Sequence, residues 1–227
     1  MDAITPIRYV RGHAHDVSLD DTFDFLNTDD LENGFPVDHL PTLDDALDWF
    51  VARGVIHGEG ADRIRAKAGA RPDAADPELA RIRKVRSALR EAAIAFFEHR
   101  RPKTGTLDTI NRALHARQVI ELVPSADGIS VDHRHVGDPI DDALARLADP
   151  LVTELTEGHP ERIKVCGGES CEWVFYDASR TSRRRWCDMS TCGNRAKAAR
   201  HRARAKAAAA DPGREIPPTS GTTPLVD

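Results

Sequence analysis

The sequence lacks the features by which most enzymes and membrane proteins are recognised. No run of apolar residues approaches the roughly 20 that a membrane-spanning helix requires, so we expect no membrane segment and no membrane partner. The chain has no glycine-rich loop for binding phosphate groups and no nucleophile elbow. It contains no cysteine outside one short stretch, which leaves no thiol for catalysis if that stretch binds a metal. These absences predict a protein that is not an enzyme.

The four cysteines of the chain are Cys166, Cys171, Cys187 and Cys192, two C-x4-C pairs separated by fifteen residues. Each pair can supply two thiolates from one tight turn, and the intervening segment can bring the pairs together. The alternative is two disulfides, which require an oxidising compartment. Residues 1–6 do not have the basic start and apolar core of a secretory signal, so we expect a cytoplasmic protein. The spacing therefore predicts one structural Zn²⁺, with no coordination position left open for water or substrate.

The net charge of −5 conceals a strong separation of charge along the chain. Between Arg180 and Lys206 there are ten basic residues and one acid, Asp188, so this segment carries +9 and the remainder −14. An acidic body with a basic arm is typical of proteins that bind a polyanion. Two alternatives are a solvated charged helix and an arm that docks on the acidic body of the protein itself.

Hydrophobic periodicity predicts a mainly α fold with one β-hairpin. After a flexible lead-in at residues 1–16, we expect a helical N-terminal domain over residues 17–158, in which residues 17–28 fit either a strand or a short helix. Thr42 is the expected N-cap of the first clear helix. The predicted helices cover 41–50, 60–69, 77–99, 105–117 and 139–157, and the predicted hairpin strands cover 119–123 and 129–134.

A small zinc module and a basic helix follow over residues 161–210, behind a linker at residues 158–160, and residues 211–227 form a tail that we expect to be disordered. A module of about 35 residues needs a metal to be stable, and its aromatic residues can pack a small core around that metal. Asn194 is placed to cap the basic helix. The aromatic residues concerned are Trp173, Phe175, Tyr176 and Trp186.

The basic residues form two groups that suit contact with phosphate or with a guanine edge. One group lies between the cysteine pairs, where metal binding would fix guanidinium groups in space. The other lies on the helix, where Lys197, Arg200 and Arg204 make one stripe and Arg195, Arg202 and Lys206 another on the opposite side, with no stripe of large apolar residues. Two basic edges fit a groove between two phosphate walls. The predicted nucleic-acid contacts are Arg180, Arg183, Arg184, Arg185, Arg195, Lys197, Arg200 and Arg204.

Polar residues near position 25 are weaker candidates for a site in the N-terminal domain. Asp20, Asp21 and Asp24 fit a carboxylate pair or a cation site, or simply an acidic turn. Asn27 and Thr28 follow an apolar run, where they would line a pocket or cap the next turn.

The cysteine region resembles the CGNR-type zinc finger of bacterial proteins. The resemblance rests on Cys166-x4-Cys171 and on the segments 171–180 (CEWVFYDASR), 184–189 (RRWCDM) and 192–197 (CGNRAK). The preceding 150 or so residues resemble the ABATE domain, through Phe25-Leu-Asn-Thr28 and through Leu43-x-x-Ala46-Leu-x-Trp49 closing at Gly54. The resemblance implies a zinc-binding, stress-induced transcriptional regulator.

These observations together predict a DNA-binding transcriptional regulator. The finger and its helix would bind double-stranded DNA, and the N-terminal domain would bind a small-molecule effector or a protein partner. A homodimer would make specific recognition easier, because one finger contacts few base pairs. Two alternatives stay open. Trp173, Tyr176 and Trp186 could stack on RNA bases, or the zinc module could dock a protein.

Overall fold

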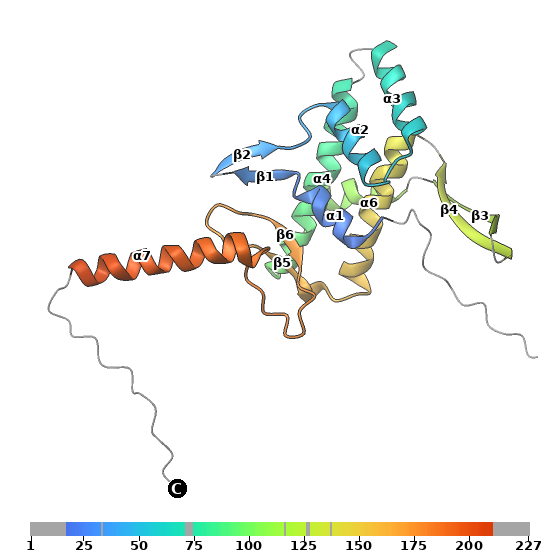
Figure 1. Cartoon of the computed structure of the whole chain (residues 1–227). Coiled ribbons are helices and arrows are strands. Elements are labelled where there is room, and N and C mark those ends of the chain that lie inside the picture. The colour runs from blue at the N-terminus through green and yellow to red at the C-terminus, as the bar shows by residue number, and fades with distance from the viewer. Residues whose placement is uncertain are drawn as a thin grey trace, which may run out of the picture. The chain divides into compact units, whose positions relative to one another are not determined.

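The computed structural model describes residues 17–32, 34–70, 75–115, 117–125, 128–136 and 138–210 (Figure 1). The predicted lead-in and the predicted tail lie outside these residues. The chain divides into two compact units, one up to Cys187 and the other from Asp188 onward. The described part contains seven α-helices and three two-stranded antiparallel sheets, which confirms the mainly α class. Within that part, no helix has the length and apolar character needed to cross a membrane.

The first unit contains most of the regular elements. In chain order they are α1 (Leu19–Leu26), β1 (Asp29–Glu32), β2 (Phe35–Asp38), α2 (Leu43–Ala52), α3 (Gly58–Ala70), α4 (Ala75–Phe97), α5 (Thr104–Leu114), β3 (Arg117–Ser125), β4 (Gly128–Val136), α6 (Pro139–Thr156), the 3-10 turn η2 (Pro160–Arg162), β5 (Ile163–Val165) and β6 (Val174–Tyr176). The second unit contains the π-helical turn η3 (Met189–Gly193) and α7 (Asn194–Ala210).

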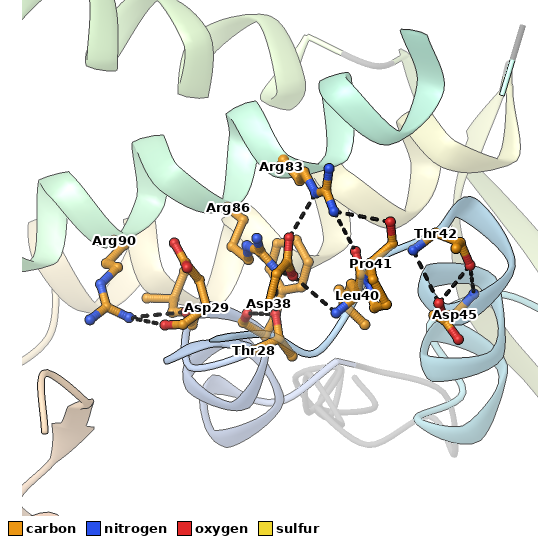
Figure 2. Close-up of polar contacts among 12 residues, drawn as sticks. Thr28, Asp29, Asp38, Leu40, Pro41, Thr42, Asp45, Arg83, Arg86 and Arg90 are labelled. Carbon is orange, nitrogen blue, oxygen red and sulfur yellow. Dashed lines mark hydrogen bonds and ion pairs between the residues drawn. The ribbon is translucent and has the colours of Figure 1, made fainter. Parts of the chain in front are cut away.

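The first two helices begin with the same side-chain cap. In α1 the Ser18 hydroxyl accepts the backbone N–H of Asp21 at 3.1 Å, and the Asp21 carboxylate accepts the N–H of Ser18 at 3.0 Å. Thr42 and Asp45 form the same reciprocal pair at the start of α2 (Figure 2), which confirms the predicted N-cap. The cap makes residues 19–26 a helix rather than a strand, because it satisfies N–H groups that a helix start leaves unpaired.

The core of the first unit lies where α1 and α5 each contact both α4 and α6. Leu89 of α4 and Leu144 of α6 are fully or almost fully buried there. An aromatic group from α1 and α2 extends this core: the ring centroid of Phe25 lies 5.7 Å from that of Trp49 and 5.9 Å from that of Phe50. Tilted ring pairs at this separation are favourable beyond the area that they bury.

Three arginines on one face of α4 hold the segment between α1 and α2. Arg83, Arg86 and Arg90 are spaced by three and four residues, so they share a face of the helix, and Figure 2 shows them reaching this segment. Arg86 is only 3% exposed and donates to Asp38 and to the Thr28 hydroxyl, both at 2.8 Å. Arg83 donates to two backbone carbonyls at 3.1 Å. The strands β1 and β2 are therefore fixed to the core by polar contacts.

Strands β3 and β4 pair with Ser125 opposite Gly128, which confirms the predicted hairpin. The sequence did not predict the pair β1–β2, joined through Gly34, or the pair β5–β6. Gly34 has a φ of +84°, a conformation that glycine adopts without steric cost.

Strands β5 and β6 belong to the core of the N-terminal domain. Ile163 and Val174 are 1% and 0% exposed and lie in the same cluster as the helix residues, with Tyr176 packed against it. The expectation that Trp173, Phe175 and Tyr176 form a separate core around the metal is therefore wrong for Tyr176. Phe175 is buried outside that cluster, so for Phe175 and Trp173 the expectation stays a prediction. Successive side chains of a strand face opposite ways, so Val174 and Tyr176 face the helices while Phe175 does not. Trp173 keeps 37% of its surface exposed.

Candidate metal centre and nucleic-acid interface

The four cysteine sulfurs lie close enough together to bind one metal ion. All four Sγ atoms are within 4.8 Å of one another, and those of Cys171 and Cys187 are 3.7 Å apart. A tetrahedron of thiolates with metal–sulfur bonds of about 2.3 Å places its sulfurs about 3.8 Å apart. None of the four cysteines forms a disulfide, which would need a sulfur–sulfur separation of about 2.05 Å. They form the zinc-binding site, and four thiolates close it to other ligands.

Backbone hydrogen bonds shape the turn that carries the first cysteine pair. The N–H of Cys166 donates to the Trp173 carbonyl at 2.9 Å, directly after the β5–β6 ladder. The N–H of Gly167 donates to the Arg185 carbonyl at 2.8 Å, which brings the segment before Cys187 alongside the turn. A Cβ at Gly167 would approach that carbonyl and the Trp186 ring to 3.3 Å. The close approach explains the glycine directly after the first ligand.

Some N–H groups of the described residues donate to the cysteine sulfurs. The backbone N–H of Cys187 lies 3.5 Å from the Cys166 sulfur, and Nη2 of Arg195 lies 3.2 Å from the Cys192 sulfur. Donors of this kind stabilise thiolates and orient metal ligands. The donor set therefore fits deprotonated cysteines around a divalent cation.

Cys192 lies in the turn η3, which begins five residues before α7. The Asp188 carboxylate caps this turn, accepting the N–H of Thr191 at 2.8 Å. The prediction that Asn194 caps the basic helix is wrong, because Asn194 has helical backbone angles and its amide donates to the Ser190 carbonyl at 3.0 Å. The turn η3, which contains the metal ligand Cys192, thus continues directly into the basic helix α7. The capping residue is Asp188, which lies before Cys192 in the chain.

The buried Asp177 organises the loop 178–186, which carries the arginines near the metal. Asp177 is 0% exposed and accepts the backbone N–H groups of Ser179 at 3.0 Å and Arg184 at 2.7 Å. Burial by itself raises the pKa of Asp177, but the hydrogen bonds from Ser179 and Arg184 outweigh it and hold the pKa below its usual value. The sequence predicted no separate role for this residue, which is recognisable only from the contacts of its loop.

Replacing Asp177 by asparagine should loosen this loop. The amide cannot accept as strongly as a carboxylate, and hydrogen bonds to a charged group contribute about 1.5–3 kcal/mol to stability. We expect faster amide hydrogen exchange at Ser179 and Arg184 and a loss of about 2 kcal/mol in the free energy of unfolding. The exposed Asp149→Asn substitution on α6 is the control. Unchanged exchange in the loop would contradict this role.

The arginines of the loop differ in their contacts. Arg184 stacks over the Phe175 ring, with 5.1 Å between the guanidinium carbon and the ring centroid, and it donates to the Cys187 carbonyl. Arg185 stacks over Trp186 at 5.2 Å. Arg180 and Arg183 are exposed. Arg184 therefore contributes to the structure around the metal as well as to the positive charge of the surface.

The helix α7 carries its basic residues on the surface, and no acid occurs in it. Lys197, Arg200, His201 and Arg204 line a shallow depression on one side. His201 was missed from the sequence, although its position four residues after Lys197 places it on the same stripe. Arg195, on the opposite side by helical periodicity, directs one nitrogen at the Cys192 sulfur.

Asn27 and Thr28 are both buried, and their side chains form hydrogen bonds within the protein. Thr28 donates to the Phe25 carbonyl at 2.7 Å, a local bond of the kind expected for a cap, and accepts from Arg86. Asn27 instead bonds to the backbone of Val174 in β6. Asp21 and Asp24 pair with Arg53, so these acids take part in ion pairs rather than in a cation site.

Comparison with known protein families agrees with this geometry. The family model of the CGNR zinc finger matches residues 162–205, which include all four cysteines. The family model named ABATE, described as "Putative stress-induced transcription regulator", matches residues 22–158. No curated protein matches the chain.

Proposed function

Because the chain belongs to the ABATE family and carries a CGNR zinc finger, we propose that it regulates transcription by binding double-stranded DNA through the finger and α7. One observation carries the proposal: the four-cysteine site is followed directly by a surface helix, α7, that has many basic residues and no acidic one. A four-cysteine zinc site is structural, so its role is to fix this basic surface. Neither family description names an enzyme.

The helix α7 would supply most of the contacts to phosphate. Lys197, Arg200 and Arg204 are exposed on one stripe, and His201 extends it. Cations that neutralise phosphates release condensed counterions, which favours binding at low salt. A helix that packs on a protein core would need one apolar face of large side chains, and α7 has none.

The loop 178–186 would supply contacts from a rigid base. Arg180, Arg183 and Arg185 are exposed, and the buried Asp177 holds the backbone of the loop. Arg184 and Arg195 each contact the metal-binding segment, but a guanidinium has five N–H donors. Both can therefore donate to DNA as well as to their partners in the protein.

The N-terminal domain would regulate this activity by binding an effector or a protein partner, in a cytoplasmic protein. A homodimer would double the number of base pairs contacted, which a single finger needs for specificity. Sequencing of genomic DNA fragments retained by the zinc-loaded protein tests the proposal. Sharp peaks that share a motif support a sequence-specific regulator, and no retention would overturn it.

Replacing Arg200 and Arg204 together by alanine should weaken DNA binding and reduce its dependence on salt. Each phosphate contact contributes about 0.9 to the slope of log affinity against log salt, so the slope should fall by about two units. The control is the double variant Arg63→Ala with Arg101→Ala. It also removes two positive charges, but from exposed positions outside α7. An unchanged slope for the α7 variant would mean that this helix does not contact the DNA backbone.

The exposed Trp173 favours RNA as a second candidate ligand, since an exposed indole can stack on an unpaired base. Competition between duplex DNA and single-stranded RNA separates the two ligands. Preference for RNA, lost on Trp173→Ala substitution, would support this second candidate.

A further inference from the structure

Strand β6 has one hydrogen-bonding edge that faces away from β5. The N–H of Cys166 donates to the Trp173 carbonyl, and the N–H of Asp177 donates to the Arg162 carbonyl. Backbone groups of an antiparallel strand alternate in direction, so Val174, next to Trp173, directs its N–H and carbonyl away from β5. Val174 is 0% exposed, and both groups would be unpaired and buried without another partner.

Asn27 of the N-terminal domain pairs with both of these groups. Its Oδ1 accepts the N–H of Val174 at 2.9 Å, and its Nδ2 donates to the Val174 carbonyl at 2.9 Å. A primary amide carries an acceptor and a donor side by side, so it can replace the missing neighbouring strand. Asn27 is itself only 6% exposed, and 147 residues separate it from Val174.

Arg90 makes a second connection to the same end of the turn between β5 and β6, two residues before Val174. Its Nη2 donates to the Glu172 carbonyl at 2.7 Å, and its Nη1 donates to the Asp29 carbonyl at 2.7 Å. Figure 2 shows Arg90 reaching Asp29 from α4. Glu172 directly follows the metal ligand Cys171. One guanidinium thus joins the N-terminal domain to the residue beside a zinc ligand.

The N-terminal domain therefore fixes both ends of the turn that carries the first cysteine pair. Cys166 directly follows β5, which contacts α4, and Cys171 lies three residues before β6, which contacts α1 and α4. We propose that Asn27 and Arg90 are positioning residues for the zinc site, and that through them zinc binding and the stability of the N-terminal domain are coupled. The coupling goes beyond DNA binding, because it holds for any nucleic acid or protein that the finger contacts.

The coupling has two consequences that follow from thermodynamic linkage. Zinc binds the folded turn, so zinc stabilises the N-terminal elements on which that turn is built. Equally, a rearrangement of α1 or α4 changes the affinity of the finger for zinc. It also changes how well ordered the turn with Cys166 and Cys171 is. Binding of a ligand to the N-terminal domain has a physical route to the finger through Asn27 and Arg90.

The first test compares the full-length protein with its Asn27→Asp variant. The substitution preserves size but places a carboxylate oxygen against the Val174 carbonyl. We expect zinc affinity, measured by competition with a chromogenic chelator, to fall about tenfold or more, within the usual range of coupling between sites. Asn111→Asp, at an exposed position on α5, is the control and should leave the affinity unchanged.

The second test uses a matched pair of arginines, in case Asn27→Asp prevents folding. Arg90 and Arg83 lie on the same face of α4 and both donate to backbone carbonyls, but only Arg90 reaches the zinc module. Arg90 donates to the carbonyls of Asp29 and Glu172 with two different nitrogens, whereas a lysine side chain has only one nitrogen. Arg90→Lys should therefore accelerate zinc release to the chelator, whereas Arg83→Lys should lower stability without changing zinc release.

The third test needs no substitution. Chelating zinc from the wild-type protein should raise amide hydrogen exchange in α1 and α4, which contact β5 and β6, more than in α3. The proposal is overturned if Asn27→Asp and Arg90→Lys fold and bind zinc as the wild type does. It is equally overturned if Arg83→Lys affects zinc release as strongly as Arg90→Lys, since general destabilisation would then explain both.

Discussion

Replacing Cys187 by serine should abolish stoichiometric zinc binding and unfold the loop 178–186 together with η3. A structural zinc site contributes about 10–16 kcal/mol of apparent binding free energy in zinc-finger peptides, and this binding needs the complete set of deprotonated ligands. Cys187 is the best choice because it is only partly buried, whereas Cys166, Cys171 and Cys192 are 6%, 8% and 3% exposed. Serine at Cys187 therefore disturbs packing least.

The expected readouts are a zinc content near zero, rapid amide exchange in the loop and η3, and loss of DNA binding. The N-terminal domain should still unfold cooperatively, because its helices form their own core, but at a lower temperature, because β5 and β6 belong to that core. Chelation of the wild type is the control. Adding zinc back should restore the chelated wild type and not the variant, and a variant that still bound one zinc would contradict the four-cysteine site.

The zinc site was predictable because its signal is local in the sequence. Cys166 and Cys171, like Cys187 and Cys192, supply two thiolates from one turn, so their spacing alone identifies the ligands and their number. The helices were predictable for the same reason. Thr42 and Asp45 lie three residues apart, and a cap of this kind is visible in any sequence that contains it.

The hydrogen bonds that connect the finger to the N-terminal domain could not be predicted in this way. Asn27 and Val174 are separated by 147 residues, and an amide that replaces a strand neighbour has no periodic pattern. The three-residue strands β5 and β6 are too short to show alternation, and they border cysteines that suggest a loop. Asn194 was misassigned for a related reason. The turn η3 is π-helical and contains a metal ligand, so its start does not resemble an ordinary helix start.

Part of the acidic body of the protein takes part in local ion pairs. Arg65 lies within ion-pair distance of Asp44, Asp48 and Asp62, and Arg81 pairs with acids of α4 and α6 in the same way. Each exposed pair contributes little to stability. The net charge of −14 outside residues 180–206 already includes these arginines, so the ion pairs leave the negative charge of the body unchanged. Docking of the basic arm on the body therefore stays an alternative to an external polyanion.

Replacing Asp38 by asparagine should destabilise the N-terminal domain strongly at neutral pH. Asp38 is the ion-pair partner of Arg86, which is 3% exposed, and it also pairs with Arg83. Removing one member of a buried pair leaves the other charge uncompensated, and we expect a loss of about 3 kcal/mol in the free energy of unfolding. Denaturant unfolding at pH 7 measures this loss, with the exposed Asp108→Asn substitution on α5 as the control.

The same variant should differ less from the wild type in acid. Burial raises the pKa of Asp38, but the hydrogen bond and charge of Arg86, the N–H of Leu40 and the charge of Arg83 outweigh it and hold the pKa below its usual value. A carboxyl with a lowered pKa in the folded state stabilises above its unfolded pKa of about 3.9, and this contribution disappears as the pH falls through the folded value. Once Asp38 is protonated, the wild type carries the same neutral side chain as the variant, so the two stabilities should begin to converge as the pH falls below the unfolded pKa and should meet below the lowered folded pKa. A difference between them that stays constant from pH 7 to pH 3 would mean that packing around Asp38, rather than its charge, holds the segment between α1 and α2 to α4.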